Sequence, residues 1–278
     1  MDVNDVLPRP ARDRTVPVRQ ANAGRAAVVL VGGHEGGADV AVKPLAEQGP
    51  VLRAPSAGRP LERVLNQALD GRDLPVCVVP MTLGRDPHLV ADTARTLIGP
   101  ARGRDAGRIV LADPFGSATL LTGWLRVAVT RATGGLDAAD VAALLTADSA
   151  SPFDDAELFR IAHLLRVQGS VSRVEAAFHG GDPDVAAGLE RCRRLGAREV
   201  AVIPAGFGSA IDSPPAGVID GGPLLTPAEI SGMLATRVDA AVLKLSRGDD
   251  GIAAGLDADH EQHGHRGASW QEPGADAS

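Results

Sequence analysis

Short apolar runs alternate with amphipathic segments along most of the chain. Runs rich in β-branched residues, typical of strands buried on both faces, lie at Ala26–Val31, Val51–Ala54, Val76–Val79, Ile109–Ala112, Val141–Leu145, Val174–Phe178, Val200–Ile203 and, more weakly, Gly217–Ile219. Apolar residues at helical spacing predict helices at Pro60–Leu69, His88–Ile98, Asp155–Val167, Val185–Leu195 and Pro227–Ala235. Strands that alternate with helices predict an α/β fold built on parallel sheets.

The two halves of this pattern match one another in three places, in the same order. PLERVL at Pro60 matches GLERCR at Gly188, VCVVPMTLG at Val76 matches VAVIPAGFG at Val200, and DPFGSATLLTGWL at Asp113 matches GGPLLTPAEISGML at Gly221. Three matches in one order indicate a duplication. We therefore predict two tandem, similar lobes, each a four-stranded parallel sheet flanked by helices.

The repeat also divides the chain into domains. We expect an N-terminal lobe with the active site at residues 25–135 and a degenerate C-terminal lobe at residues 136–246. Residues 1–24 and 247–278 are polar and aperiodic, a composition that buries too little apolar surface to fold, and predict a disordered leader and a disordered tail. The tail holds His260, His263 and His265, in a tract of the kind that collects metal ions.

Candidate chemistry follows the strand at Val76–Val79. After a Gly-Arg-Asp-Pro turn, His88, Asp92 and Arg95 stand at i, i+4 and i+7 of the predicted helix, on one face. This face lies just beyond the carboxyl end of a parallel strand, where open α/β sheets bind ligands. The alternative is that His88 is solvated or caps the helix. The segment from Pro204 to Pro223, which corresponds to this one in the second half, is too short to hold such a helix.

A second histidine follows the first strand. Val28–Gly37 reads VVLVGGHEGG, and the glycines would let the backbone approach a ligand while His34 points over the strand ends. The alternative is an ordinary turn that contains a histidine. His179 follows the strand at Val174–Phe178, either facing the cleft between the halves or lying outside it.

These motifs resemble those of the class II tetrapyrrole metal chelatases, the sirohydrochlorin-type cobaltochelatases and ferrochelatases. Their second motif is a V-V-P-x-x-L strand followed by histidine and aspartate four residues apart, here His88 and Asp92. Their first motif is a strand that ends in G-H-G-S-R, here with His34, although Glu35 replaces the glycine and the Ser-Arg pair is absent. The long forms of the family are two such halves in tandem, and the resemblance covers roughly residues 26–245.

The resemblance implies ATP-independent insertion of a divalent metal, Co²⁺, Fe²⁺ or Ni²⁺, into sirohydrochlorin or a related tetrapyrrole, for cobalamin or siroheme synthesis. His34 and His88 would bind the metal, which is a substrate, and would share the catalytic work with Asp92. Imidazole suits both roles near neutral pH. Arg85 and Arg95 would meet the carboxylates of the tetrapyrrole. The alternatives are a diverged enzyme acting on another substrate and a carrier of metal or tetrapyrrole without turnover.

Composition narrows the remaining classes. The 278 residues carry a net charge of −7, which argues against nucleic acid as a partner. No phosphate-binding glycine motif occurs, so we expect no nucleotide cofactor. The two cysteines, Cys77 and Cys192, have no metal-binding spacing. No long apolar run or signal segment is present, which predicts a cytoplasmic protein without a membrane partner. We expect it to act as a monomer.

Overall fold

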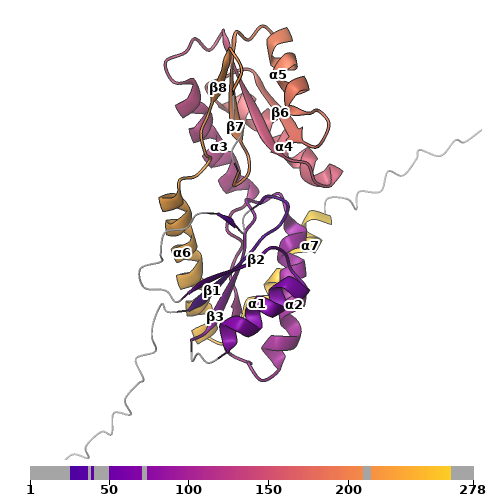
Figure 1. The fold of residues 1–278 in the computed structure, drawn as a ribbon, viewed down its shortest axis with the longest axis vertical. Helices are drawn as coiled ribbons and strands as arrows, with labels where there is room; N and C mark the ends of the chain where they lie inside the picture. The colour runs from indigo at the N-terminus through magenta and orange to yellow at the C-terminus, as the bar shows by residue number, and fades with distance from the viewer. Residues whose placement is uncertain (1–25, 37–38, 41–49, 71–73, 209–213, 264–278) are drawn as a thin grey trace, which may run out of the picture.

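The computed structural model describes residues 26–36, 39–40, 50–70, 74–208 and 214–263 of the chain. These residues form two lobes, each built on a four-stranded sheet in which every strand pair is parallel (Figure 1). The predicted α/β architecture with two tandem, similar lobes is confirmed. The leader predicted at residues 1–24 lies outside the described residues.

The two sheets have the same strand order. The first is β2-β1-β3-β4 and the second is β6-β5-β7-β8, so each lobe places its first strand between its second and third. The strands are β1 Ala27–Val31, β2 Val51–Ala54, β3 Val76–Pro80, β4 Ile109–Leu111, β5 Val141–Asp148, β6 Val174–His179, β7 Glu199–Pro204 and β8 Val218–Asp220. The third strand ends at a proline in both lobes: Pro80 lies opposite Val31, and Pro204 opposite Thr146. The shared order supports the duplication inferred from the sequence.

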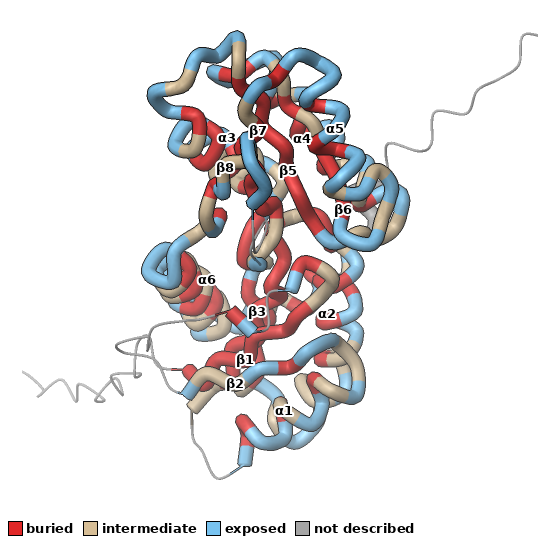
Figure 2. Tube along the Cα trace, turned by 45° about the horizontal axis from the view of Figure 1, so that its top comes forward, coloured by how far each residue is buried: buried red, intermediate tan, exposed pale blue. Residues whose placement is uncertain are grey.

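The central strands are buried on both faces, as their uninterrupted apolar sequences predicted (Figure 2). In β1, Ala27, Val29 and Val31 belong to one apolar cluster, whereas Val28 and Leu30 belong to another. Alternate side chains of a strand point to opposite faces. Each face of the first sheet therefore needs a cover of its own.

Seven helices surround the two sheets in the part of the chain that the structure describes. They are α1 Arg59–Leu69, α2 Pro87–Arg102, α3 Ala118–Thr133, α4 Pro152–Gln168, α5 Val185–Arg194, α6 Pro227–Ser246 and α7 Ile252–His263. The sequence pattern did not predict α3 or α7, and it ended α6 too early. The described residues between β7 and β8 contain no helix, as their length predicted. None of the described helices has the length and hydropathy needed to cross a membrane.

The two lobes exchange one helix each. Helix α3 follows the first sheet in sequence but packs on β5 and β7 of the second, whereas α6 follows the second sheet and packs on β3 and β4 of the first (Figure 1). The buried side chains of α6 include Leu234 and Val238, and those of α3 include Leu121 and Leu125. Each lobe thus receives at least part of the cover of one sheet face from the other half of the chain.

One basic side chain on each exchanged helix contacts the segment that follows the fourth strand of the sheet it covers. On α3, Arg131 donates from Nη2 to the carbonyl oxygens of Gly221, at 3.1 Å, and Pro223, at 3.0 Å, beyond β8. On α6, Lys244 lies 2.8 Å from a carboxylate oxygen of Asp113, just beyond β4. Both helices are therefore held at the end of the fourth strand of the other half's sheet.

This exchange corrects the predicted boundary between residues 135 and 136. Among the described residues, the first lobe consists of β1 to β4 with α1 and α2, together with α6 and α7, and the second lobe of β5 to β8 with α3, α4 and α5. The prediction was wrong because periodicity shows which face of a helix is apolar but does not show which sheet that face covers.

The tail predicted to be disordered from residue 247 contains α7, which packs along α2 and against β4. Ile252 is buried, and Leu256 packs against the same apolar cluster. Gly255 allows the close approach, because a Cβ atom there would lie 2.4 Å from a methyl carbon of Leu111. Two large apolar side chains among small ones are enough to dock this helix, although they give only a weak periodic signal.

We predict that the exchanged helix decides which fragment folds. A fragment of residues 117–226 keeps α3 on the second sheet and should unfold cooperatively in a thermal scan. A fragment of residues 136–246 loses Leu121 and Leu125 from that core, at about 1.5–3 kcal/mol for each large side chain, and should show no cooperative transition. If residues 136–246 prove the better-folded fragment, the helix exchange is contradicted.

We predict that α7 contributes to stability. A chain that ends at Ser246 should unfold at lower urea concentration than one that ends at His263, with about 2 kcal/mol or more lost through the exposure of Ile252 and Leu256 and of their partners. The chain ending at His263 is the control, since it keeps α7 and lacks only residues 264–278. Equal unfolding midpoints for the two chains would show that α7 does not stabilise the lobe.

Candidate active site

The site begins at the turn after β1, where His34 meets Asp86. His34 Nδ1 lies 3.1 Å from Asp86 Oδ2, and the two side chains are 22% and 11% exposed. Gly33 makes this contact possible, because a Cβ atom at that position would lie only 2.3 Å from the same carboxylate oxygen. The glycine before His34 therefore serves the approach of Asp86 to the β1 turn.

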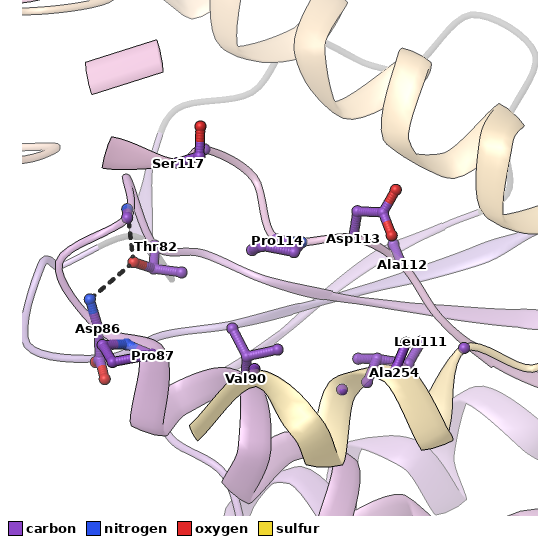
Figure 3. A pocket seen from close by; sticks show the side chains of 15 residues that line it. Thr82, Asp86, Pro87, Val90, Leu111, Ala112, Asp113, Pro114, Ser117 and Ala254 are labelled. Carbon is purple, nitrogen blue, oxygen red and sulfur yellow. Dashed lines mark hydrogen bonds between the residues drawn. The ribbon is translucent and has the colours of Figure 1, made fainter. Parts of the chain in front are cut away.

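Asp86 is fixed from its own side as well. It is the N-cap of α2, and its Oδ1 accepts a hydrogen bond from Leu89 N at 2.9 Å. Thr82 Oγ1 accepts from Gly84 N at 2.9 Å and from Asp86 N at 3.2 Å, the two bonds drawn in Figure 3. One carboxylate oxygen thus caps the helix while the other meets the imidazole.

The contact changes the ionisation of both partners. Burial alone would raise the pKa of Asp86, but the hydrogen bond and charge of His34, with the Leu89 N–H, hold it below its ordinary value of 3.8. Burial alone would lower the pKa of His34, but the hydrogen bond and charge of Asp86, with the charge of Glu35, raise it above its ordinary value of 6.5. The pair therefore favours a carboxylate beside an imidazolium.

The other imidazole nitrogen of His34 is left over. His34 Nε2 is buried and has no hydrogen-bond partner among the described residues. Buried polar atoms are nearly always paired, so one without a partner calls for an explanation. With Nδ1 committed to Asp86, Nε2 is the atom of His34 that is left for a ligand or a proton.

Glu35 lies beside this pair and is almost completely buried. Its Oε2 accepts from the Thr82 hydroxyl and from Leu83 N, the latter at 2.9 Å, whereas its Oε1 has no partner among the described residues. Burial raises the pKa of Glu35, against the opposing effects of the Thr82 hydrogen bond and the Arg85 charge. The residue that stands where the chelatase motif has glycine is thus part of the site.

The contacts of His34 described above involve neither His88 nor Asp92. His88 and Asp92 are exposed on α2, and Asp92 forms an ion pair with Arg95, itself about half exposed. The predicted i, i+4 spacing is present, and both side chains lie on the exposed side of α2. The residue of this segment that contacts His34 is Asp86, two residues before His88; a metal ion shared by His34 and His88 stays a prediction.

Arg85 was expected to bind substrate carboxylates and is instead buried. Its side chain is 1% exposed and reaches the second lobe, where Nη2 lies 3.3 Å from Asp155 Oδ1. This guanidinium is thus engaged inside the protein, and its predicted role in carboxylate binding stays a prediction. Among the described residues, no group of three or more histidine, cysteine, aspartate or glutamate side chains is arranged to hold a metal ion.

A cavity of about 340 Å³ opens beside the Asp86 end of the pair (Figure 3). Asp86, Pro87 and Val90 line one side of it, and Asp113 and Ser117 lie on the loop that follows β4. Small residues complete the wall: Gly251, which precedes α7, and Ala254, Gly255 and Ala258 of that helix. The volume lies within the range usual for small-molecule sites, about 300–1,000 Å³.

A smaller cavity, of about 40 Å³, lies between the lobes. Glu35 and Arg85 of the first lobe line it together with Thr146 and His179 of the second. The Thr146 hydroxyl is buried and has no partner among the described residues. Of the two alternatives for His179, the structure supports the one that faces the junction of the halves.

Asp86 was missed although a sequence signal for it existed. Aspartate directly before a proline that opens a helix is a common N-cap pattern, whereas Asp86-Pro87 was interpreted only as part of a turn. Nothing in the local sequence indicates that the second carboxylate oxygen meets a histidine more than fifty residues away. Arg85 gave no signal either, because buried arginines are rare.

Comparison with known proteins gives little further information. The sequence matches no family model, and it matches no curated protein. The fold is similar to a crystal structure of DR2241 from Deinococcus radiodurans, described as a multi-domain protein with structural similarity to chelatases and with two additional novel domains. The two share 21% identity with a TM-score of 0.44 over 79% of this chain and 54% of that one, so this chain spans about half of that protein. Such a resemblance does not establish a shared function.

We predict a pH-dependent stabilisation from the pair. The part due to Asp86 is lost as pH falls through its lowered pKa, and the part due to His34 is lost as pH rises through its raised pKa. Asp86→Asn should therefore cost about 1–2 kcal/mol in urea unfolding between pH 4 and 6.5, and clearly less at pH 9.

Asp184→Asn provides the matched control. Asp184 caps α5 through Ala187 N at 2.7 Å and is exposed, and no histidine among the described residues forms an ion pair with it. Asparagine caps helices about as well as aspartate, so neither variant should lose its cap. Equal pH profiles for the two variants would show that His34 and Asp86 do not interact in solution.

Proposed function

We propose that the protein inserts a divalent metal ion into a tetrapyrrole without ATP, and that His34, held by Asp86, is the reactive group. The observation that carries the proposal is the His34 imidazole, which is fixed at Nδ1 by a carboxylate and keeps Nε2 without a partner among the described residues. A carboxylate behind a histidine sets its tautomer and raises its basicity, an arrangement found at metal-ligating histidines. The pair lies at the carboxyl ends of parallel strands, where α/β proteins bind ligands.

The chemistry needs an atom that binds a metal ion and accepts a proton. Metal entry displaces two protons from pyrrole nitrogens, and His34 Nε2 in its neutral form is able to accept one at a time and pass it to solvent. The same lone pair is able to hold the incoming ion, and imidazole suits Co²⁺, Ni²⁺ and Fe²⁺ alike. Because the pKa of His34 is raised above 6.5, the rate should rise with pH through that raised value.

The cavity beside Asp86 would receive one edge of the macrocycle. Its wall is mainly apolar and suits a pyrrole face, and the described lining contains no arginine or lysine. The carboxylates of a sirohydrochlorin-like substrate would therefore stay at the mouth of the cavity, in water. In this proposal Asp86 has the orienting role that the family resemblance gave to Asp92.

We expect His34→Ala to lower the rate of metal insertion by about 10²–10⁴, the usual effect of removing a positioned acid–base group. Asp86→Asn should lower it by about 10–100, as expected for a partner that orients a ligand. His88→Ala, a change on the exposed side of the same helix, should cost less than about tenfold. The measurement is the absorbance change of sirohydrochlorin with Co²⁺, Fe²⁺ or Ni²⁺, relative to the reaction without protein.

Two results would change the assignment. Equal losses for His88→Ala and His34→Ala would restore the two-histidine site expected from the family resemblance. Stoichiometric binding of metal or tetrapyrrole without repeated turnover would indicate a carrier. A parental rate for folded His34→Ala protein would contradict the proposal.

A further inference from the structure

Arg85 is the buried link between the two lobes. It follows β3 in the first lobe, and its guanidinium lies among three acceptors of the second lobe, one at the end of β5 and two in the first turn of α4. Nε donates to Asp154 O at 3.4 Å, and Nη2 approaches Asp148 O at 3.5 Å and Asp155 Oδ1 at 3.3 Å. A guanidinium presents its donors in a fixed planar fork, so it sets the relative positions of the acceptors it holds, whereas an ammonium is a compact charge with rotatable donors.

The start of α4, which receives Arg85, is itself organised around Asp155. Asp155 Oδ2 accepts from Ser149 Oγ at 3.0 Å, and its Oδ1 accepts from Ala150 N at 3.1 Å. The carboxylate is therefore fixed within the second lobe before Arg85 reaches it. An isolated buried charge is costly, and an arginine that is 1% exposed stays in place only because these acceptors compensate it.

Arg85 is also the neighbour of Asp86 in the chain. The turn that carries both residues leads from Thr82 into α2, and Asp86 holds His34 at its far end. The contacts thus run without a gap from Asp155 in the second lobe through Arg85 and Asp86 to His34. The second lobe has no helix corresponding to α2 among its described residues, so this chain of contacts gives that lobe a use in the site.

We propose that Arg85 is a positioning residue, through which the second lobe holds Asp86 and His34 in their reactive arrangement. This inference rests on the proposed role of His34. A contact that only holds the lobes together would leave the hydrogen bond between His34 and Asp86 unchanged when Asp155 is altered. A positioning contact would change that hydrogen bond.

The test is nuclear magnetic resonance of the full chain with ¹⁵N-labelled histidine, without metal or tetrapyrrole. The quantity measured is the rate at which the His34 Nδ1 proton exchanges with water at one fixed pH, and the signal is assigned by its loss in His34→Gln. Asp155→Ala should accelerate this exchange by about tenfold or more, since a hydrogen bond between charged groups contributes about that factor. Asp155 is not among the groups that shift the pKa of His34, so the change reports position.

Arg85→Lys is the second variant, and it decides the test if Asp155→Ala does not fold. It keeps the positive charge near His34 but loses the planar fork, and it should also accelerate the exchange. The matched control is Glu157→Ala, which removes the ion pair with Arg160 from the same helix α4 without touching Arg85. The control should leave the exchange rate unchanged.

The proposal is overturned if folded Arg85→Lys protein, or folded Asp155→Ala protein, exchanges this proton within about twofold of the parent rate, because the contact is then a tie only. It is also overturned if Glu157→Ala accelerates exchange as much as they do. The exchange measurement uses no substrate, so it can be interpreted even if the metal-insertion assay fails. The positioning role of Arg85 and the proposed metal insertion are therefore tested separately.

Discussion

Parallel sheets must be covered on both faces, and this requirement organises the molecule. Each sheet receives helices of its own half on one face, but part of the other cover comes from the opposite half, through α3 and α6. The exchange holds the two lobes together and brings the carboxyl end of β1 to the loop beyond β7, where Glu35 O accepts from Phe207 N at 3.3 Å. If the lobes were not linked in this way, Arg85 and Glu35 would not be buried between them.

The site depends on polar groups that are buried away from water. Asp86 caps a helix and holds an imidazole at the same time, and Thr82 fixes the turn between them. Each such group is expensive to bury unless it is paired, and the pairs made among the described residues leave one nitrogen of His34 and one oxygen of Glu35 over. Of the four buried side-chain atoms without a partner among the described residues, two therefore belong to neighbouring residues of the site.

The sequence was sufficient for the strands, the lobe repeat and the position of His34, because each of these depends on local pattern. Pro80 and Pro204 mark the ends of equivalent strands, and the glycine-flanked histidine follows β1, the strand that pairs with the first of them. The partner of His34 was not predictable, since Asp86 reaches it only because Gly33 has no side chain. The burial of Arg85 and the destination of α3 and α6 depend on contacts between distant segments, which periodicity does not describe.

The helix exchange also has a consequence for how the chain folds as it is synthesised. One face of the first sheet is covered by α6, which is synthesised much later. The contact between Asp113 and Lys244 joins positions 131 residues apart. At usual rates of synthesis, about 5–20 residues per second, that interval is on the order of ten seconds. During it, Leu30, Cys77 and Val79, which end in the same core cluster as α6, have no native cover. The nascent first lobe therefore exposes apolar surface that favours aggregation or chaperone binding until α6 has been made.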